Sequence, residues 1–142
     1  MASSTTNRTF TIIKPDSVRK GNFGKIISRI ESEGFRVLGV KKIELSQRQA
    51  QAFYAVHKER PFYGSLVEYM TSGPVYVAAL EREGAVPELR KLMGATDPTK
   101  ADAGTIRKEF GESIEQNAIH GSDSDENAAI EIAFFFAESE LV

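Results

Sequence analysis

Hydrophobic and polar positions along the chain switch between strand spacing and helix spacing. Residues 9–14 alternate as a strand does, and Pro15 ends the run. Between residues 23 and 30, apolar side chains recur three and four positions apart, which is typical of one helix face, and Gly34 stands where a helix C-terminus is expected. The chain is therefore predicted to begin with a strand followed by a helix.

The middle of the chain predicts a second strand and two helices. Residues 35–45 have strand composition, with valine, isoleucine and leucine among lysines. Ser46 and Gln49 have the spacing of a capping box, which predicts a helix over 46–56. A further apolar stripe predicts a helix over 61–72, ended by a glycine and a proline.

The second half of the chain predicts short elements and one long irregular segment. Residues 75–80 are apolar at every position except one tyrosine, which favours a central strand buried on both faces, and a short helix follows over 85–93. Residues 94–116 contain turn residues and little periodicity, as in long functional loops. A short strand is predicted over 117–120.

A final helix, capped by Asp123 or Ser124, completes the order: β-α-β, a helical hairpin, β-α-β and a helix. This order predicts an α+β fold of the ferredoxin-like, split βαβ type, in which helices cover a four-stranded antiparallel sheet and a helical hairpin is inserted. No linker or repeat divides the chain. We therefore expect one domain over residues 1–142, with residues 1–7 as a flexible N-terminus.

The amino-acid composition excludes several kinds of chemistry. The 142 residues include no cysteine and two histidines, His57 and His120, which excludes disulfides, thiolate catalysis and cysteine-based metal sites. With 18 basic and 20 acidic residues, the net charge of −2 argues against a dedicated nucleic-acid-binding protein. The apolar runs are too short to cross a bilayer, and the N-terminus lacks the apolar core of a signal peptide. We therefore expect a cytoplasmic protein with no membrane and no obligatory nucleic-acid partner.

One histidine lies in a pattern that suggests catalysis. Residues 117–124 read Asn-Ala-Ile-His-Gly-Ser-Asp-Ser, so that His120 stands at the end of a predicted strand. Glu131 follows eleven residues later in the last helix, where a carboxylate could orient one ring nitrogen and leave the other as a nucleophile. The spacing alone leaves two interpretations open, a catalytic histidine or a histidine that only caps a turn.

Other polar residues could bind a polyphosphate. Each of them alone is most often a solvated surface residue. Together they supply the lysine, the two arginines and the hydroxyl that bind phosphate oxygens well. They are Lys14, Arg90, Thr96, Arg107 and Asn117.

Six segments together resemble a known family. They are 11–16 (TIIKPD), 57–62 (HKERPF), 71–74 (TSGP), 92–96 (LMGAT), 104–107 (GTIR) and 117–124 (NAIHGSDS). In this order they resemble the motifs of nucleoside diphosphate kinases of bacterial type. The resemblance covers essentially all of residues 8–137, and its His-Gly-Ser-Asp core is highly specific.

The resemblance implies an activity and a set of site residues. The activity is transfer of the γ-phosphate of a nucleoside triphosphate, mainly ATP, to a nucleoside or deoxynucleoside diphosphate, which maintains the triphosphate pools. The route would be ping-pong, through a phosphohistidine at His120. The resemblance assigns catalytic roles to His120, Glu131, Lys14 and Tyr54, and nucleotide binding to Lys14, Phe62, Arg90, Thr96, Arg107 and Asn117.

It also implies a cofactor and an assembly. Mg²⁺ would arrive on the nucleotide phosphates, with no direct protein ligand and a contact through water to Asp123. The family forms homo-oligomers, here a tetramer or a hexamer. Two pairs depart from the common pattern, because Glu115-Gln116 stands where many members have Gly-Arg, and Phe135-Phe136 where many have Trp-Phe. We expect neither pair to touch the nucleotide ligands, and both to bear on subunit contacts and local stability.

Two other classes of protein share parts of the pattern. A catalytically idle nucleotide-binding or regulatory module of the same fold would keep the pocket but would not need His120. An RNA-binding domain would carry a basic surface, and the GxxG match at residues 21–24 lacks one. His57, near a predicted helix end, is more often structural. The retention of His120, Glu131 and the cations favours the kinase.

Overall fold

Four strands form one antiparallel sheet in the computed structural model, which describes residues 7–142. They are β1 (Arg8–Ile13), β2 (Arg36–Ile43), β3 (Val75–Glu81) and β4 (Ile119–Gly121). Their order across the sheet is β2-β3-β1-β4, in which the first and third strands lie at the centre. The predicted ferredoxin-like, split βαβ arrangement is confirmed.

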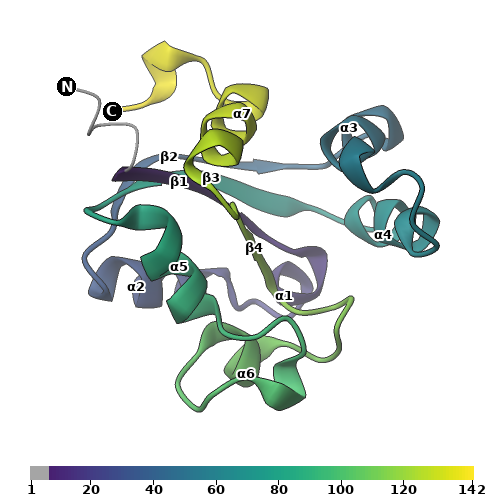
Figure 1. Cartoon of the computed structure of the whole chain (residues 1–142), viewed down its shortest axis with the longest axis horizontal. Coiled ribbons are helices and arrows are strands. Elements are labelled where there is room, and N and C mark those ends of the chain that lie inside the picture. The colour runs from purple at the N-terminus through teal and green to yellow at the C-terminus, as the bar shows by residue number, and fades with distance from the viewer. Residues whose placement is uncertain (1–6) are drawn as a thin grey trace.

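Helices cover both faces of the sheet. They are α1 (Pro15–Arg19), α2 (Phe23–Ser32), α3 (Gln47–Phe53), α4 (Tyr63–Met70), α5 (Ala85–Met93), α6 (Ile106–Phe110) and α7 (Asp125–Phe135), with short 3-10 helices at Ala55–His57, Pro98–Lys100 and Glu138–Glu140. Figure 1 shows α2 and α5 on one side of the sheet, α7 on the other, and the hairpin of α3 and α4 at one end. The predicted hairpin insertion between β2 and β3 is therefore correct.

The apolar side chains of β3 are divided between two cores. Val75, Val77 and Ala79 pack with residues of α7, α3 and α4. Ala78 and Leu80 point to the other face and pack against α2 and α5. Because both faces are covered, β3 has apolar residues on both, as its sequence predicts.

The start of α3 follows its predicted capping box. The N–H of Gln49 donates to Ser46 Oγ at 3.1 Å, and the N–H of Ser46 donates to Gln49 Oε1 at 2.9 Å. The helix ends at Phe53 rather than at Val56, because the next residues tighten into the 3-10 helix Ala55–His57. This change of pitch brings Tyr54 into the core, where it is buried.

Two short helices were not predicted. Lys14 is the N-cap residue of α1 rather than the end of a strand, and Pro15 occupies the first helical position. In the predicted loop 94–116, α6 begins at Ile106, after its N-cap residue Thr105, whose hydroxyl accepts a hydrogen bond from the N–H of Lys108 at 3.3 Å. Both helices have five residues, which is too short to show helical periodicity in the sequence.

The segment after α5 depends on a glycine. Gly94 has a φ of +88°, and a Cβ there would lie 2.7 Å from the Cβ of Thr105, the N-cap residue of α6. Gly104 has the same φ of +88° but open space around it. Both positions therefore have a φ that alanine rarely adopts, and they differ in the packing that a Cβ would meet.

We expect Gly94→Ala to lower the free energy of unfolding by about 1–3 kcal/mol more than Gly104→Ala does. Both variants place an alanine at a positive φ, and only the first forces Thr105 out of place. Denaturant unfolding of the two variants measures the difference. Equal losses of stability would show that Thr105 yields without cost.

The first described residue, Asn7, is hydrogen-bonded to the residue that follows β3. The carbonyl of Asn7 accepts a hydrogen bond from the N–H of Arg82 at 2.9 Å. A flexible N-terminus is expected over residues 1–7. Positions 1–6 of this range lie outside the described residues. Within residues 7–142, no helix has the length and apolar character needed to cross a membrane.

Candidate active site

His120 lies in β4 and is held by a carboxylate of α7. Its Nε2 lies 3.0 Å from Glu131 Oε1, and the two side chains are 21% and 19% exposed. Ser122 Oγ donates to the same Oε1 at 2.7 Å. A carboxylate beside Nε2 favours the tautomer with the proton on Nε2. Nδ1 then keeps its lone pair, and no described residue forms a hydrogen bond to it.

Aromatic rings surround the imidazole on its inner side. The ring centroids of Phe10, Phe53 and Tyr54 lie 6.2, 5.6 and 6.5 Å from that of His120. Tyr54 is buried, and its hydroxyl has no hydrogen-bond partner among the described residues. Burial and the Glu131 carboxylate raise the pKa of Tyr54 well above its usual range. Tyr54 therefore keeps its proton and can act as a donor beside the histidine.

The backbone just before His120 is strained. The N–H of Ile119 donates to the carbonyl of Asn117 at 2.9 Å, and the buried residue between them, Ala118, has a φ of +76°. These features describe a γ-turn with a left-handed central residue, a conformation that is rare for alanine. The carbonyl of Ala118 accepts from the N–H of Lys14 at 2.9 Å. The turn thus fixes Asn117 and His120 relative to the end of β1.

Asn117 connects three of the predicted site residues. Its Oδ1 accepts a hydrogen bond from Lys14 Nζ at 2.8 Å, and its Nδ2 donates to the carbonyl of Thr96 at 3.1 Å. These residues come from the start of α1, the segment after α5 and the segment before β4. The structure therefore brings together side chains that are up to 103 positions apart in the sequence.

Arg107 lies within electrostatic reach of two other cations, Lys14 and Arg90. Burial and the charge of Arg107 lower the pKa of Lys14 to about 8, although Asp16 and Glu115 act in the opposite direction. Burial and the charge of Arg90 lower the pKa of Arg107 to about 10. Like charges gathered in this way stabilise a bound polyanion.

The guanidinium of Arg107 is fixed by backbone carbonyls. It donates to the carbonyl of Gly94 at 3.2 Å and to that of Ile119 at 2.9 Å. Its Nε is buried without a partner among the described residues. Because these partners are neutral, the positive charge of Arg107 remains available to a ligand.

The remaining predicted residues lie at the edges of this group. Arg90 and Asp123 are exposed, and hydrogen bonding from Asn127, followed by the charge of Arg90, holds the pKa of the Asp123 carboxyl below its usual range. Phe62 is the N-cap residue of α4, is 45% exposed, and has its ring 5.5 Å from that of His57. His57 therefore contacts Phe62, and no described contact links it to His120.

Some residues of the site were not singled out from the sequence. The cap of α7 is Ser124, one of the two predicted residues, and Ser122 is buried against Glu131. At Gly121, Met93 and Leu89 of α5 occupy the place where a Cβ would be, so the glycine allows α5 to pack against β4. No spacing in the sequence signals either contact.

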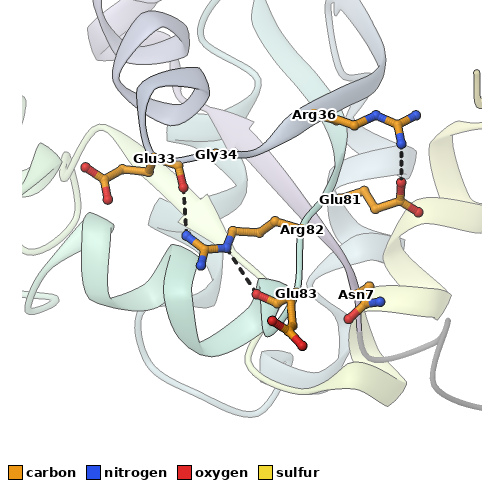
Figure 2. Close-up of a pocket in the computed structure, with 7 residues that line it drawn as sticks. All are labelled: Asn7, Glu33, Gly34, Arg36, Glu81, Arg82 and Glu83. Atoms are coloured by element: carbon orange, nitrogen blue, oxygen red, sulfur yellow. Dashed lines mark hydrogen bonds and ion pairs between the residues drawn. The ribbon is translucent and has the colours of Figure 1, made fainter.

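A pocket elsewhere contains none of the predicted site residues. Figure 2 shows it beside Arg82, whose guanidinium donates to the carbonyls of Glu33 and Glu83 at 2.7 and 3.1 Å. Arg36 Nη1 lies 2.9 Å from Glu81 Oε1 in the same pocket. Glu81 pairs with Arg8, at the opposite end of β1 from Lys14. The arginines of this pocket are already bound by Glu81 and by backbone carbonyls, so we place the candidate active site at His120.

Comparison with known proteins agrees with this geometry. The family model for nucleoside diphosphate kinase matches residues 7–141. The nucleoside diphosphate kinase of Granulibacter bethesdensis is 62% identical over 135 residues, which cover 95% of this chain and 96% of that protein. This chain belongs to the nucleoside diphosphate kinase family.

Other members show similar agreement. The nucleoside diphosphate kinase of Sulfurimonas denitrificans is 60% identical over 134 residues, covering 94% of this chain and 98% of that protein. The solved structure of the Aquifex aeolicus nucleoside diphosphate kinase has a TM-score of 0.94 at 45% identity, covering 96% of this chain and 99% of that one. The Halobacterium salinarum nucleoside diphosphate kinase, solved in complex with CDP, has a TM-score of 0.92 at 41% identity, with coverages of 96% and 91%.

The enzyme class expected from the sequence is therefore confirmed. The chain is a phosphotransferase that moves a phosphate from nucleoside triphosphates to nucleoside diphosphates. Its substrates are nucleotides, and the family requires a divalent cation.

Proposed function

We propose that this kinase works by a ping-pong route in which His120 carries the phosphoryl group between two nucleotides. The observation that supports this most is the contact between Nε2 of His120 and Oε1 of Glu131 at 3.0 Å, which leaves Nδ1 as the nucleophile. An imidazole is largely neutral at pH 7, so Nδ1 can attack without a separate base.

The two half-reactions mirror each other. In the first, the Nδ1 lone pair forms a bond to the γ-phosphorus of the triphosphate, the bond to the bridging oxygen breaks, and a nucleoside diphosphate leaves. In the second, a terminal oxygen of another diphosphate attacks the phosphorus and the bond to Nδ1 breaks. Glu131 stabilises the positive charge that the ring carries while Nδ1 is bonded to phosphorus.

The surrounding polar residues fit the binding of phosphates and ribose. Lys14, Arg90 and Arg107 would neutralise the charge on the transferring group, which such a reaction needs more than covalent help. Thr96 and Asn117 lie beside Lys14 and would complete the contacts. Tyr54, held protonated beside His120, would help to orient the ring.

Mg²⁺ is the divalent cation that we propose for this reaction. Among residues 7–142, no group of three or more acidic or histidine side chains is arranged to hold a metal. The exposed carboxylate of Asp123, which keeps its charge at neutral pH, suits a contact through water to a cation carried by the phosphates. When bound there, Mg²⁺ would neutralise phosphate charge.

We also infer a homo-oligomer, a tetramer or a hexamer, of subunits that each form a single domain. Exposed apolar side chains support association, because Val40 on the edge strand β2 is 45% exposed and Ile130 and Phe134 on α7 are 65% and 40% exposed. Sedimentation of the purified protein distinguishes the two assemblies.

Phe62 is proposed to stack on the base. Every base has a π-face, so we expect Phe62→Ala to raise the KM values for ADP, GDP, CDP and UDP by a similar factor, about tenfold. Val56→Ala is the matched control, since Val56 is an exposed apolar residue of the same hairpin. If the KM rises only for the purine nucleotides, the proposal that Phe62 stacks on every base is contradicted.

Initial rates test the ping-pong route. ATP and GDP are varied together, and a phosphorylated enzyme intermediate predicts parallel lines in double-reciprocal plots. Lines that intersect would show that both nucleotides bind before transfer, and would contradict the proposal.

A further inference from the structure

Glu115 links two parts of the nucleotide site that are far apart in the sequence. It lies between α6 and β4, two residues before Asn117. Its Oε2 accepts a hydrogen bond from Ser65 Oγ at 2.7 Å. Ser65 lies in the first turn of α4, and its hydroxyl is also 3.0 Å from the carbonyl of Phe62. The contact therefore joins the hairpin that carries Phe62 to the segment that carries Asn117.

The bond is the direct link between these two parts. Within residues 7–142, it is the only hydrogen bond between α4 and the segment from α6 to β4. Around it lies a polar pocket, lined also by Arg19, Glu68 and Gln116. The inner face of α4 is anchored in the core by Tyr69 and Met70, so the Ser65–Glu115 bond acts on the outer, N-terminal end of the helix, next to Phe62.

Glu115 also acts electrostatically on Lys14. The sequence predicts no contact between Glu115 and the site, but its carboxylate lies close enough to raise the pKa of Lys14. Lys14 is faced by the cation Arg107 of α6 and by two carboxylates, those of Asp16 in α1 and of Glu115. Its Nζ also donates to Asn117 Oδ1. Glu115 therefore favours the ammonium form that a phosphate attracts.

We propose that Glu115 is a positioning residue of the nucleotide site, which fixes the hairpin bearing Phe62 and supports the positive charge of Lys14. The inference rests on the proposed function, because it assumes that Phe62 and Lys14 contact the nucleotide.

Two variants separate the effect of the Ser65–Glu115 hydrogen bond from that of the Glu115 charge. Ser65→Ala removes the hydroxyl and keeps the Glu115 carboxylate, so we expect the KM for nucleoside diphosphates to rise about two- to fivefold with kcat and the pH profile unchanged. Glu115→Gln keeps an acceptor for Ser65 and removes the charge. In the wild type, we expect kcat/KM to fall as Lys14 loses its proton, because its pKa is lowered to about 8. Without the Glu115 charge the pKa of Lys14 is lower still, so this alkaline limb moves to lower pH.

Glu112→Gln is the matched control. Glu112 is a carboxylate of the same segment, and it pairs with Lys20. If Ser65→Ala and Glu115→Gln both show the KM and the pH profile of this control, the inference is overturned. Labelling of the wild type with γ-labelled ATP is carried out in parallel. An unlabelled wild type contradicts the proposed function, whereas a labelled wild type with variants like the control contradicts only the role of Glu115.

Discussion

His120→Ala is expected to lower kcat by about 10⁵-fold, because it removes the atom that accepts the phosphoryl group. Nucleotide affinity should remain close to that of the wild type, since Lys14, Asn117 and Arg107 are held by contacts that do not involve the imidazole. Steady-state turnover measures the first effect and calorimetric titration with a nucleoside diphosphate measures the second.

The second histidine supplies the control for this experiment. His57→Ala removes an imidazole that contacts Phe62 and has no described contact with His120. We expect its kcat to stay within a few-fold of the wild type. A His120→Ala enzyme that turns over at the rate of His57→Ala would refute the assignment of the nucleophile.

Glu131→Ala is expected to lower kcat by about 10²-fold, since misplacement of a reacting group by about 1 Å has an effect of this size. The carboxylate fixes the ring through Nε2 and selects the tautomer with a lone pair on Nδ1. Loss of the carboxylate also leaves Ser122 Oγ without its acceptor at 2.7 Å. Steady-state kinetics at saturating nucleotide measures the change.

A carboxylate elsewhere on α7 is the matched control. Glu126 lies in the first turn of the same helix and is exposed. Glu126→Ala should leave kcat close to the wild type. If Glu131→Ala and Glu126→Ala have the same kcat, Glu131 does not orient the nucleophile.

The fold could be predicted where single elements are long enough to show their period. The spacing of apolar side chains predicts the helix α2 and the strand β3, which is apolar on both faces. The five-residue helices α1 and α6 were missed, because one and a half turns do not repeat a pattern. Their capping signals, Pro15 and Thr105, were present but do not by themselves distinguish a helix from a turn.

Contacts of the site between residues close in sequence could be predicted, and contacts between residues distant in sequence could not. His120 and Glu131 belong to one strand–turn–helix unit, so their sequence spacing already suggests a contact. The contact of Lys14 with Asn117 crosses 103 positions and depends on the pairing of β1 with β4. The Ser65–Glu115 bond depends on the placement of an inserted hairpin. No periodicity encodes such contacts. The residue types indicate only that Lys14 and Asn117 could share a polyphosphate site, and the resemblance to the family assigns both to nucleotide binding.

Covalent labelling tests the central claim most directly. The protein is incubated with γ-labelled ATP and Mg²⁺, freed of nucleotide, and examined for a label that is labile in acid and stable in base, as a phosphohistidine is. Addition of GDP should move the label to GTP, and His120→Ala should take up none. Absence of label on the wild type, or a label that survives His120→Ala, would contradict transfer through His120.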